Sequence, residues 1–129
     1  MPAIEKDVDY TIAVEDKMSY GLNFIIGFEQ PGTIQKFEGP PTNPDPESGK
    51  STWKTSLGKG KDIRGKELVV YVTARDENPK FKEVGVVLDL LDETNGETTQ
   101  LDPQKSGSNH EKDTAKNQVV IFKHFIQFV

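Results

Sequence analysis

A densely apolar stretch occupies residues 119–129, with the sequence Val119-Val120-Ile121-Phe122-Lys123-His124-Phe125-Ile126-Gln127-Phe128-Val129. Successive side chains of a β-strand point to opposite faces, and this run places apolar residues on both. A strand that is apolar on both faces needs cover on both faces. We therefore expect residues 119–129 either to lie centrally in a sheet or to meet a partner on their second face.

The same period of two recurs along the rest of the chain, and no convincing helical period accompanies it. Turn-forming residues separate the apolar runs, most clearly at Pro31-Gly32, Asn78-Pro79 and Asn95-Gly96, and a further turn is predicted at 18–21. The other predicted strands cover residues 8–14, 22–28, 34–37, 51–57, 68–75, 84–90 and 98–101. This pattern predicts an all-β fold: a single antiparallel β-sandwich of about seven or eight strands, immunoglobulin-like in its Greek-key architecture, with a closed β-barrel as the alternative.

The length of 129 residues favours a single domain that spans residues 1–129. Four prolines among residues 39–50 remove backbone donors and fix φ, so this segment is predicted to be a long exposed loop. Residues 102–118 are polar and rich in turn formers, which predicts a second loop.

The absence of cysteine excludes disulfides, cysteine-ligated zinc, iron–sulfur clusters and thiol catalysis. No apolar run approaches the ~20 residues that a membrane helix needs. The first residues lack the cationic start and apolar stretch of a signal peptide. These features predict a soluble protein without an integral membrane segment, and they favour the cytoplasm without fixing the compartment.

Charge is unevenly distributed along the chain, whose net charge is −5. Residues 50–66 hold six cations and one acid, a local charge of +5 that leaves −10 for the remainder. The only tryptophan lies in this segment, and an aromatic ring among cations suits an anionic partner surface. The binding candidates here are Trp53, Lys54, Lys59, Lys61 and Arg64. The alternative is a solvated basic loop with Trp53 in the core, and the overall acidity argues against nucleic acid.

Acidic residues gather at the ends of predicted strands, where loops of a sandwich meet. Calcium prefers such oxygen ligands, and the candidates are Asp76, Asp89, Asp92, Glu93 and Asn95. A calcium site there would allow calcium-dependent binding of carbohydrate or phospholipid. The alternative is that these acids solvate turns and oppose aggregation between sheet edges.

Two histidines, His110 and His124, are present. His110 lies in the polar segment, whereas His124 shares the apolar parity of Phe122 and Ile126, so we expect it to be buried and satisfied by a partner. Pairs of acidic residues also suggest a small hydrolase as a further alternative. Glycoside hydrolysis requires two carboxyl groups at a defined separation.

The function predicted from these observations is a non-enzymatic binding or assembly module that acts through protein–protein contacts and has no cofactor. The apolar stretch 119–129 supplies the interface candidates Ile121, Phe125 and Val129. Self-association through this stretch is one form that this function could take, and the partner could equally be another protein.

Overall fold

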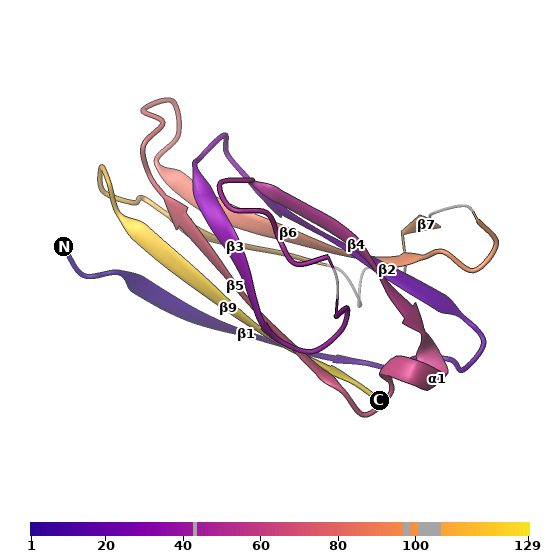
Figure 1. Ribbon diagram of the computed structural model, residues 1–129. Helices are drawn as coiled ribbons and strands as arrows, with labels where there is room; N and C mark the ends of the chain where they lie inside the picture. Colours follow the sequence, from indigo (N-terminus) through magenta and orange to yellow (C-terminus); the bar gives the residue numbers. More distant parts are fainter. Residues whose placement is uncertain (43, 97–98, 101–106) are drawn as a thin grey trace.

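The computed structural model describes residues 1–42, 44–96, 99–100 and 107–129, and this part of the chain consists mainly of β-strands. Two sheets pack face to face (Figure 1). The predicted all-β sandwich is confirmed, and the described strands form two open sheets, so the alternative of a closed barrel is wrong. The elements are β1 (Ile4–Ile12), β2 (Ser19–Ile26), β3 (Gly32–Glu38), β4 (Thr52–Lys59), α1 (Gly60–Ile63), β5 (Glu67–Arg75), β6 (Glu83–Asp92), β7 (Thr99–Gln100), β8 (Gly107–Lys112) and β9 (Val119–Phe128).

The first sheet has the strand order β1-β9-β5-β3, so the apolar strand β9 is central. β5 pairs with β9 and β3 pairs with β5 in antiparallel fashion. β1 runs parallel to β9, from Ile4 beside Val120 to Ile12 beside Phe128. The prediction of an antiparallel sandwich does not include this pair, because segments that no short hairpin connects can pair in either direction.

The second sheet has the order β4-β2-β6, and both β7 and β8 pair with the far side of β6. β8 corrects the prediction of a continuous polar loop over 102–118, of which residues 102–106 lie outside the described residues. The residues of β8, Gly107–Lys112, alternate between half-buried and exposed positions without an apolar side chain among them. An edge strand of this kind has no hydrophobic alternation by which to recognise it.

Two local predictions around β2 are also wrong. Ser19, Tyr20 and Gly21 belong to the strand rather than to a turn. Gly21 lies close beneath the Glu93 side chain, because a Cβ atom there would lie 2.6 Å from Glu93 Oε1. Phe28 lies beyond the strand and has a φ of 58°, so it begins the turn into β3.

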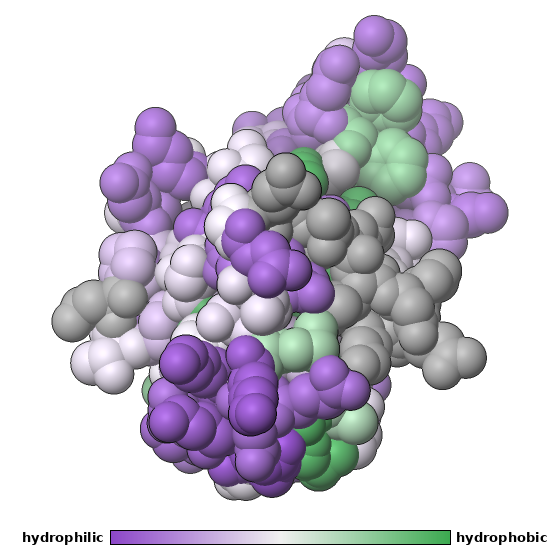
Figure 2. All heavy atoms as spheres, turned by 90° about the vertical axis from the view of Figure 1, so that its right-hand side faces the viewer, coloured by the Kyte–Doolittle hydropathy of each residue, from purple (hydrophilic) through white to green (hydrophobic). Residues whose placement is uncertain are grey.

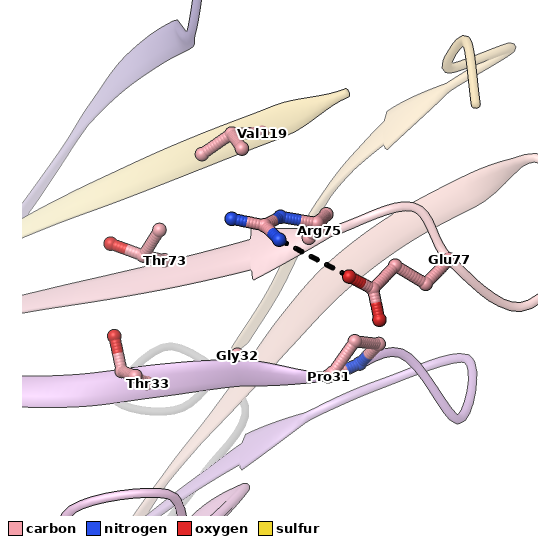
Figure 3. Close-up of a pocket in the computed structure, with 7 residues that line it drawn as sticks. All are labelled: Pro31, Gly32, Thr33, Thr73, Arg75, Glu77 and Val119. Atoms are coloured by element: carbon pink, nitrogen blue, oxygen red, sulfur yellow. Dashed lines mark hydrogen bonds and ion pairs between the residues drawn. The ribbon is translucent and has the colours of Figure 1, made fainter. Parts of the chain in front are cut away.

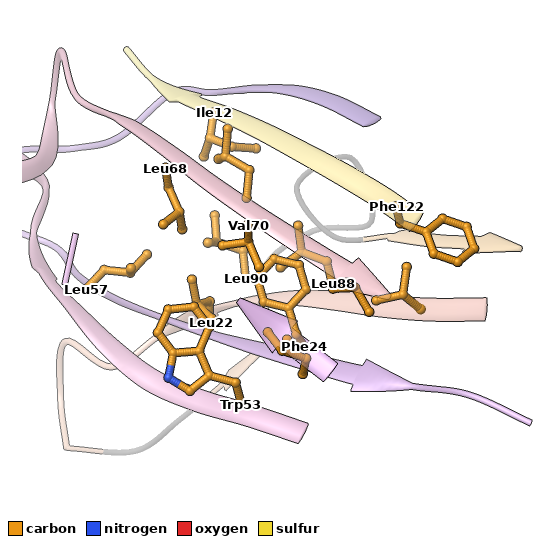
Figure 4. Close-up of a cluster of buried hydrophobic side chains, with 14 of the residues drawn as sticks. Ile12, Leu22, Phe24, Trp53, Leu57, Leu68, Val70, Leu88, Leu90 and Phe122 are labelled. Atoms are coloured by element: carbon orange, nitrogen blue, oxygen red, sulfur yellow. The ribbon is translucent and has the colours of Figure 1, made fainter. Parts of the chain in front are cut away.

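The core fills the space between the sheets (Figure 4). Alternate residues of strands such as β4 and β9 point into it, as the period of two predicts. Every even position of β9 is buried, whereas its odd positions are half-buried. The buried apolar residues include Ile12, Leu22, Phe24, Trp53, Leu57, Leu68, Val70, Leu88, Leu90 and Phe122.

Residues 39–42 and 44–50 of the proline-rich segment lie in no strand or helix, and the segment connects β3 of the first sheet to β4 of the second. Pro40 and Pro41 are buried, and the Lys36 ammonium group contacts the carbonyl oxygen of Pro41 and lies 3.1 Å from the Asp45 carboxylate. These contacts hold the loop against the first sheet.

The single turn of helix α1 lies in the glycine-rich connection between β4 and β5. Ile63, only 1% exposed, anchors it in the core. Gly60 permits a close approach of the backbone, because a Cβ atom there would lie 2.0 Å from the Glu15 carbonyl oxygen. Within the described ranges, no helix has the length and apolar character needed to cross a membrane.

Candidate functional site

The outward side of the first sheet carries aromatic and aliphatic side chains that we call the outer aromatic face, defined by Phe37, Tyr71, Ile121 and Phe125. Because the even positions of β9 are buried in the core, Ile121 and Phe125 point outward and are half-buried by their neighbours. Tyr71 of β5 lies beside Lys123 in the register of the sheet. The outward face of β9 was predicted to be covered. Because β9 lies between β1 and β5, these two strands supply part of that cover.

Three of these rings form a continuous row across β3, β5 and β9. The ring centroids of Phe37 and Tyr71 are 4.5 Å apart at an interplanar angle of 57°, and those of Tyr71 and Phe125 are 6.4 Å apart at 74°. Tilted and edge-to-face pairs at such distances are favourable arrangements of aromatic rings. Phe37 sits at a register shift between Lys36 and Glu38, and its side chain is 54% exposed. A bulge re-aims side chains in this way.

Lys123 adds a positive charge to the outer aromatic face. Its ammonium group lies 5.5 Å from the centroid of the Tyr71 ring and 2.7 Å from the Glu5 carboxylate on β1. The hydrogen bond with Glu5 raises the pKa of Lys123, and the negative charges of Glu5 and Asp7 act in the same direction. Lys123 therefore stays charged, and its charge is already matched within the chain.

A shallow hollow of about 320 Å³ adjoins this face where β3, β5 and β9 meet the turns at one end of the sheet. Thr33 and Thr73 lie opposite each other in the register, with Val119 on the neighbouring strand (Figure 3). The Arg75 guanidinium lies 3.2 Å from the Glu77 carboxylate at the rim. The hollow thus offers hydroxyl groups and a paired cation.

Val129, the third predicted interface residue of the apolar stretch, follows β9 and is 48% exposed. Its backbone amide donates to the Ile12 carbonyl, and its own carbonyl accepts from the Val14 amide, both at 2.8 Å. Val129 is therefore fixed at the end of the sheet near α1, beyond the aromatic row (Figure 1).

The structure corrects the candidate role of Trp53 as a surface ring. Trp53 is 5% exposed, and its ring lies 6.3 Å from that of Phe24 in a nearly parallel orientation in the core (Figure 4). The alternation Trp53, Thr55, Leu57 points inward along β4. The Trp53 Nε1 atom is buried and has no hydrogen-bond partner among the described residues.

The four cations predicted to accompany Trp53 lie on the surface, three of them at α1. Lys54 projects outward from β4 beside Asn23, whereas Lys59 and Lys61 are exposed at α1. The Arg64 guanidinium binds the Asp16 carboxylate and donates to the Val14 carbonyl at 2.6 Å. Hydrophilic side chains gather at the α1 end of the molecule (Figure 2). The structure does not bring these cations and Trp53 into one site.

The five calcium candidates are also divided. Asp76 is buried at the end of β5, where its carboxylate accepts a hydrogen bond from the Thr114 hydroxyl, beside the start of β6. Asp92, Glu93 and Asn95 follow one another at the opposite end of β6, and Asp89 lies within that strand. At about 3.3 Å per residue, the length of β6 separates Asp76 from Asp92 by roughly 30 Å.

Contacts within the chain engage two of the acids at the far end of β6. The Asp92 carboxylate accepts from the backbone amide of Thr94 at 2.8 Å, and hydrogen bonds from Thr94 lower the pKa of Asp92. The Glu93 carboxylate lies over Gly21. No group of three or more histidine or acidic side chains in the described part of the chain is placed to hold a metal ion.

His124 is fully buried between the sheets, as predicted from its parity. Its Nδ1 atom lies 3.3 Å from the Val70 carbonyl oxygen, whereas its Nε2 atom has no partner among the described residues, so the expected satisfaction of the ring is incomplete. Burial lowers the pKa of His124 to about 4. His110 lies at the surface of β8, with its Nδ1 atom 2.7 Å from the Glu83 carboxylate.

Comparisons of the chain with protein-family models, with curated proteins and with solved structures gave no match. The outer aromatic face therefore stands on its geometry alone. Sequence patterns predicted Ile121 and Phe125 but missed Tyr71 and Phe37. Tyr71 shares the outward parity of Thr73 within an otherwise apolar run, which is the one sequence signal that it faces outward.

Proposed function

We propose that the protein is a non-enzymatic binding or assembly module that acts through protein–protein contacts at the outer aromatic face. The observation that carries the proposal is the continuous row of Phe37, Tyr71 and Phe125, with ring centroids 4.5 Å and 6.4 Å apart, on a face that no described element of the chain covers. Aromatic side chains are enriched at protein interfaces, where they supply large apolar contact areas at low entropic cost.

Self-association is the form of this function that can be tested without knowing another partner. Ile121 and Phe125 lie on the interior strand β9 and point away from the core, so their substitution disturbs the core little. Sedimentation velocity should show a rise in mass as the concentration increases from micromolar to near millimolar. The double variant Ile121→Lys/Phe125→Lys should remain monomeric over the same range, because the two charges would have to be desolvated in the contact.

A matched control keeps two introduced lysines but moves them to the second sheet, as Thr52→Lys/Ser56→Lys on β4, where both side chains are exposed. This control should associate like the unmodified chain, and circular dichroism should show that both variants fold. A monomer at every concentration would contradict self-association, and equal dissociation of both variants would contradict the assignment to the outer aromatic face.

A further inference from the structure

We propose that the free edge of β1 binds an extended basic segment of another protein, which adds to the first sheet as a further strand. The inference rests on the proposed role in protein binding and names the chemistry of one partner. Three features of β1 support it. One backbone edge is unpaired, carboxylates occupy alternate positions of the outward face, and Lys123 of β9 already pairs with one of these carboxylates.

β1 is a long edge strand. Its nine residues, Ile4–Ile12, pair with β9 along their whole length, and no described strand pairs with their other side (Figure 1). An edge of this kind presents a row of backbone N–H and C=O groups, which is the surface that strand-adding peptides recognise. The inward face of β1 is held against the second sheet by Lys6. Its ammonium group lies 2.7 Å from the Glu111 carboxylate and donates to the His110 carbonyl.

The outward positions of β1 are Glu5, Asp7, Asp9 and Thr11, which are all exposed, and the first three are carboxylates. The Glu5 carboxylate is paired with Lys123, whose charge also interacts with Asp7, whereas Asp9 has no ion-pair partner among the described residues. Side chains at every second position recur at about 6.6–6.8 Å along a strand, and an added strand places its own side chains about 4.5–5.5 Å from them. Basic residues at alternate positions of the added strand would thus lie beside these carboxylates.

The carboxylates of β1 also indicate whether the added strand belongs to another protein or to a second copy of this chain. Two β1 edges paired with each other would bring their rows of carboxylates together, and like charges directly opposite each other destabilise a strand pair. The edge of β1 therefore disfavours its own copy and favours a cationic strand.

β9 illustrates the composition that fits beside β1. In the register of the sheet Lys123 lies beside Asp7, and Phe125 lies beside Asp9. An added strand with a basic residue beside Asp7 would repeat the Lys123 contact on the other side of β1, and apolar residues at its inward positions would extend the inner face of the sheet. The occupant is accordingly an extended segment in which lysine or arginine alternates with β-branched residues.

The test uses the full chain, labelled with ¹⁵N, and two synthetic peptides: one with alternating lysine and valine, and one with alternating glutamate and valine. The lysine peptide should slow hydrogen exchange at alternate amides of β1, those that point away from β9, because an added strand hydrogen-bonds them. The glutamate peptide should leave them unchanged. A peptide of the same composition with its lysines in one block tests whether the alternation matters, and it should bind more weakly.

Charge exchange supplies the decisive variant. Asp7→Lys/Asp9→Lys should weaken binding of the lysine peptide by at least about tenfold and should create binding of the glutamate peptide. The control Glu47→Lys/Asp62→Lys makes the same change of net charge at exposed positions outside β1 and should bind the lysine peptide as the unmodified chain does.

Equal weakening in both variants would overturn the inference, because attraction by net charge alone would then explain the binding. Protection confined to amides of the second sheet, or no protection by the lysine peptide, would also overturn it. These outcomes are distinct from a failure of the proposed function, which is measured by the association of the Ile121→Lys/Phe125→Lys variant without any peptide.

Discussion

The ring of His124 meets the ring of Phe24 edge to face between the two sheets, with centroids 4.9 Å apart and an interplanar angle of 77°. The two residues come from opposite sheets, since His124 lies on β9 and Phe24 on β2. A neutral imidazole fits this apolar setting, whereas an imidazolium would bury its charge without a counter-ion among the described residues.

The first prediction concerns acid stability. His124 binds a proton below about pH 4 in the folded chain, because burial lowers its pKa, and near its ordinary value of 6.5 once unfolded. The stability from the neutral ring is complete above pH 6.5 and is lost as the pH falls towards 4, by up to about 3 kcal/mol. In urea unfolding, His124→Leu should show a flatter loss of stability over this range. His110→Gln is the control, and an unchanged pH slope in His124→Leu would contradict the prediction.

The second prediction concerns Trp53, the only tryptophan of the chain. Because it is buried against Phe24, its fluorescence should resist quenching by iodide until the chain unfolds. Trp53→Ala should lower the free energy of unfolding by about 3–5 kcal/mol. The exposed Phe37 provides a control, and Phe37→Ala should cost less than about 1 kcal/mol. Efficient quenching in the folded chain would show that Trp53 faces solvent.

The third prediction concerns Gln30, whose side chain is 3% exposed and braces the connection between β5 and β6. Its Oε1 atom accepts from the backbone amides of Glu77 and Asn78 at 3.0 and 2.8 Å, and its Nε2 atom donates to the Glu83 carbonyl at 3.2 Å. Gln30→Ala should cost about 1–3 kcal/mol, because buried backbone groups lose their partners. Hydrogen exchange should accelerate at residues 77–83. The same acceleration in the exposed-site variant Gln35→Ala would contradict this role.

The fourth prediction concerns calcium. The structure places Asp76 and Asp92 at opposite ends of β6 and engages Asp76 with Thr114. We therefore expect no change in Tm on adding calcium or a chelator. Asp76→Asn should lower Tm equally with and without calcium, since it weakens the contact with Thr114. A calcium-dependent rise in Tm that Asp92→Asn abolishes would show that calcium binds at the Asp92 end of β6.

The sandwich follows from the sequence because alternation of apolar residues is a local property. Residues 68–75 and 119–129 show it directly, and both are strands. β8 was missed because its side chains are polar on both parities, and the parallel pairing of β1 with β9 was missed because no local pattern encodes which distant strands meet. β2 ends at Ile26, and the turn at Phe28 has a positive φ. Phenylalanine rarely adopts such a φ, so its presence in the sequence does not predict the turn.

The candidate site was predictable only in part for the same reason. Ile121 and Phe125 are marked by the unusual apolar character of both parities of β9. Their neighbours in the outer aromatic face depend on register across three strands and on the bulge that turns Phe37 outward. Trp53 shows the opposite case, because flanking lysines along the sequence suggested a surface ring, whereas its own parity on β4 directs it inward.

The parallel pairing of β1 with β9 has a consequence for biogenesis. More than a hundred residues separate Ile4 from its neighbour Val120, so β1 stays without its sheet partner during almost the entire translation of this sequence. Long-range pairing of this kind slows folding and leaves apolar surface accessible to other chains in the meantime. The carboxylates of β1 keep the unpaired strand hydrated during that interval, and a cell that produces this protein quickly should depend on chaperones that bind β1.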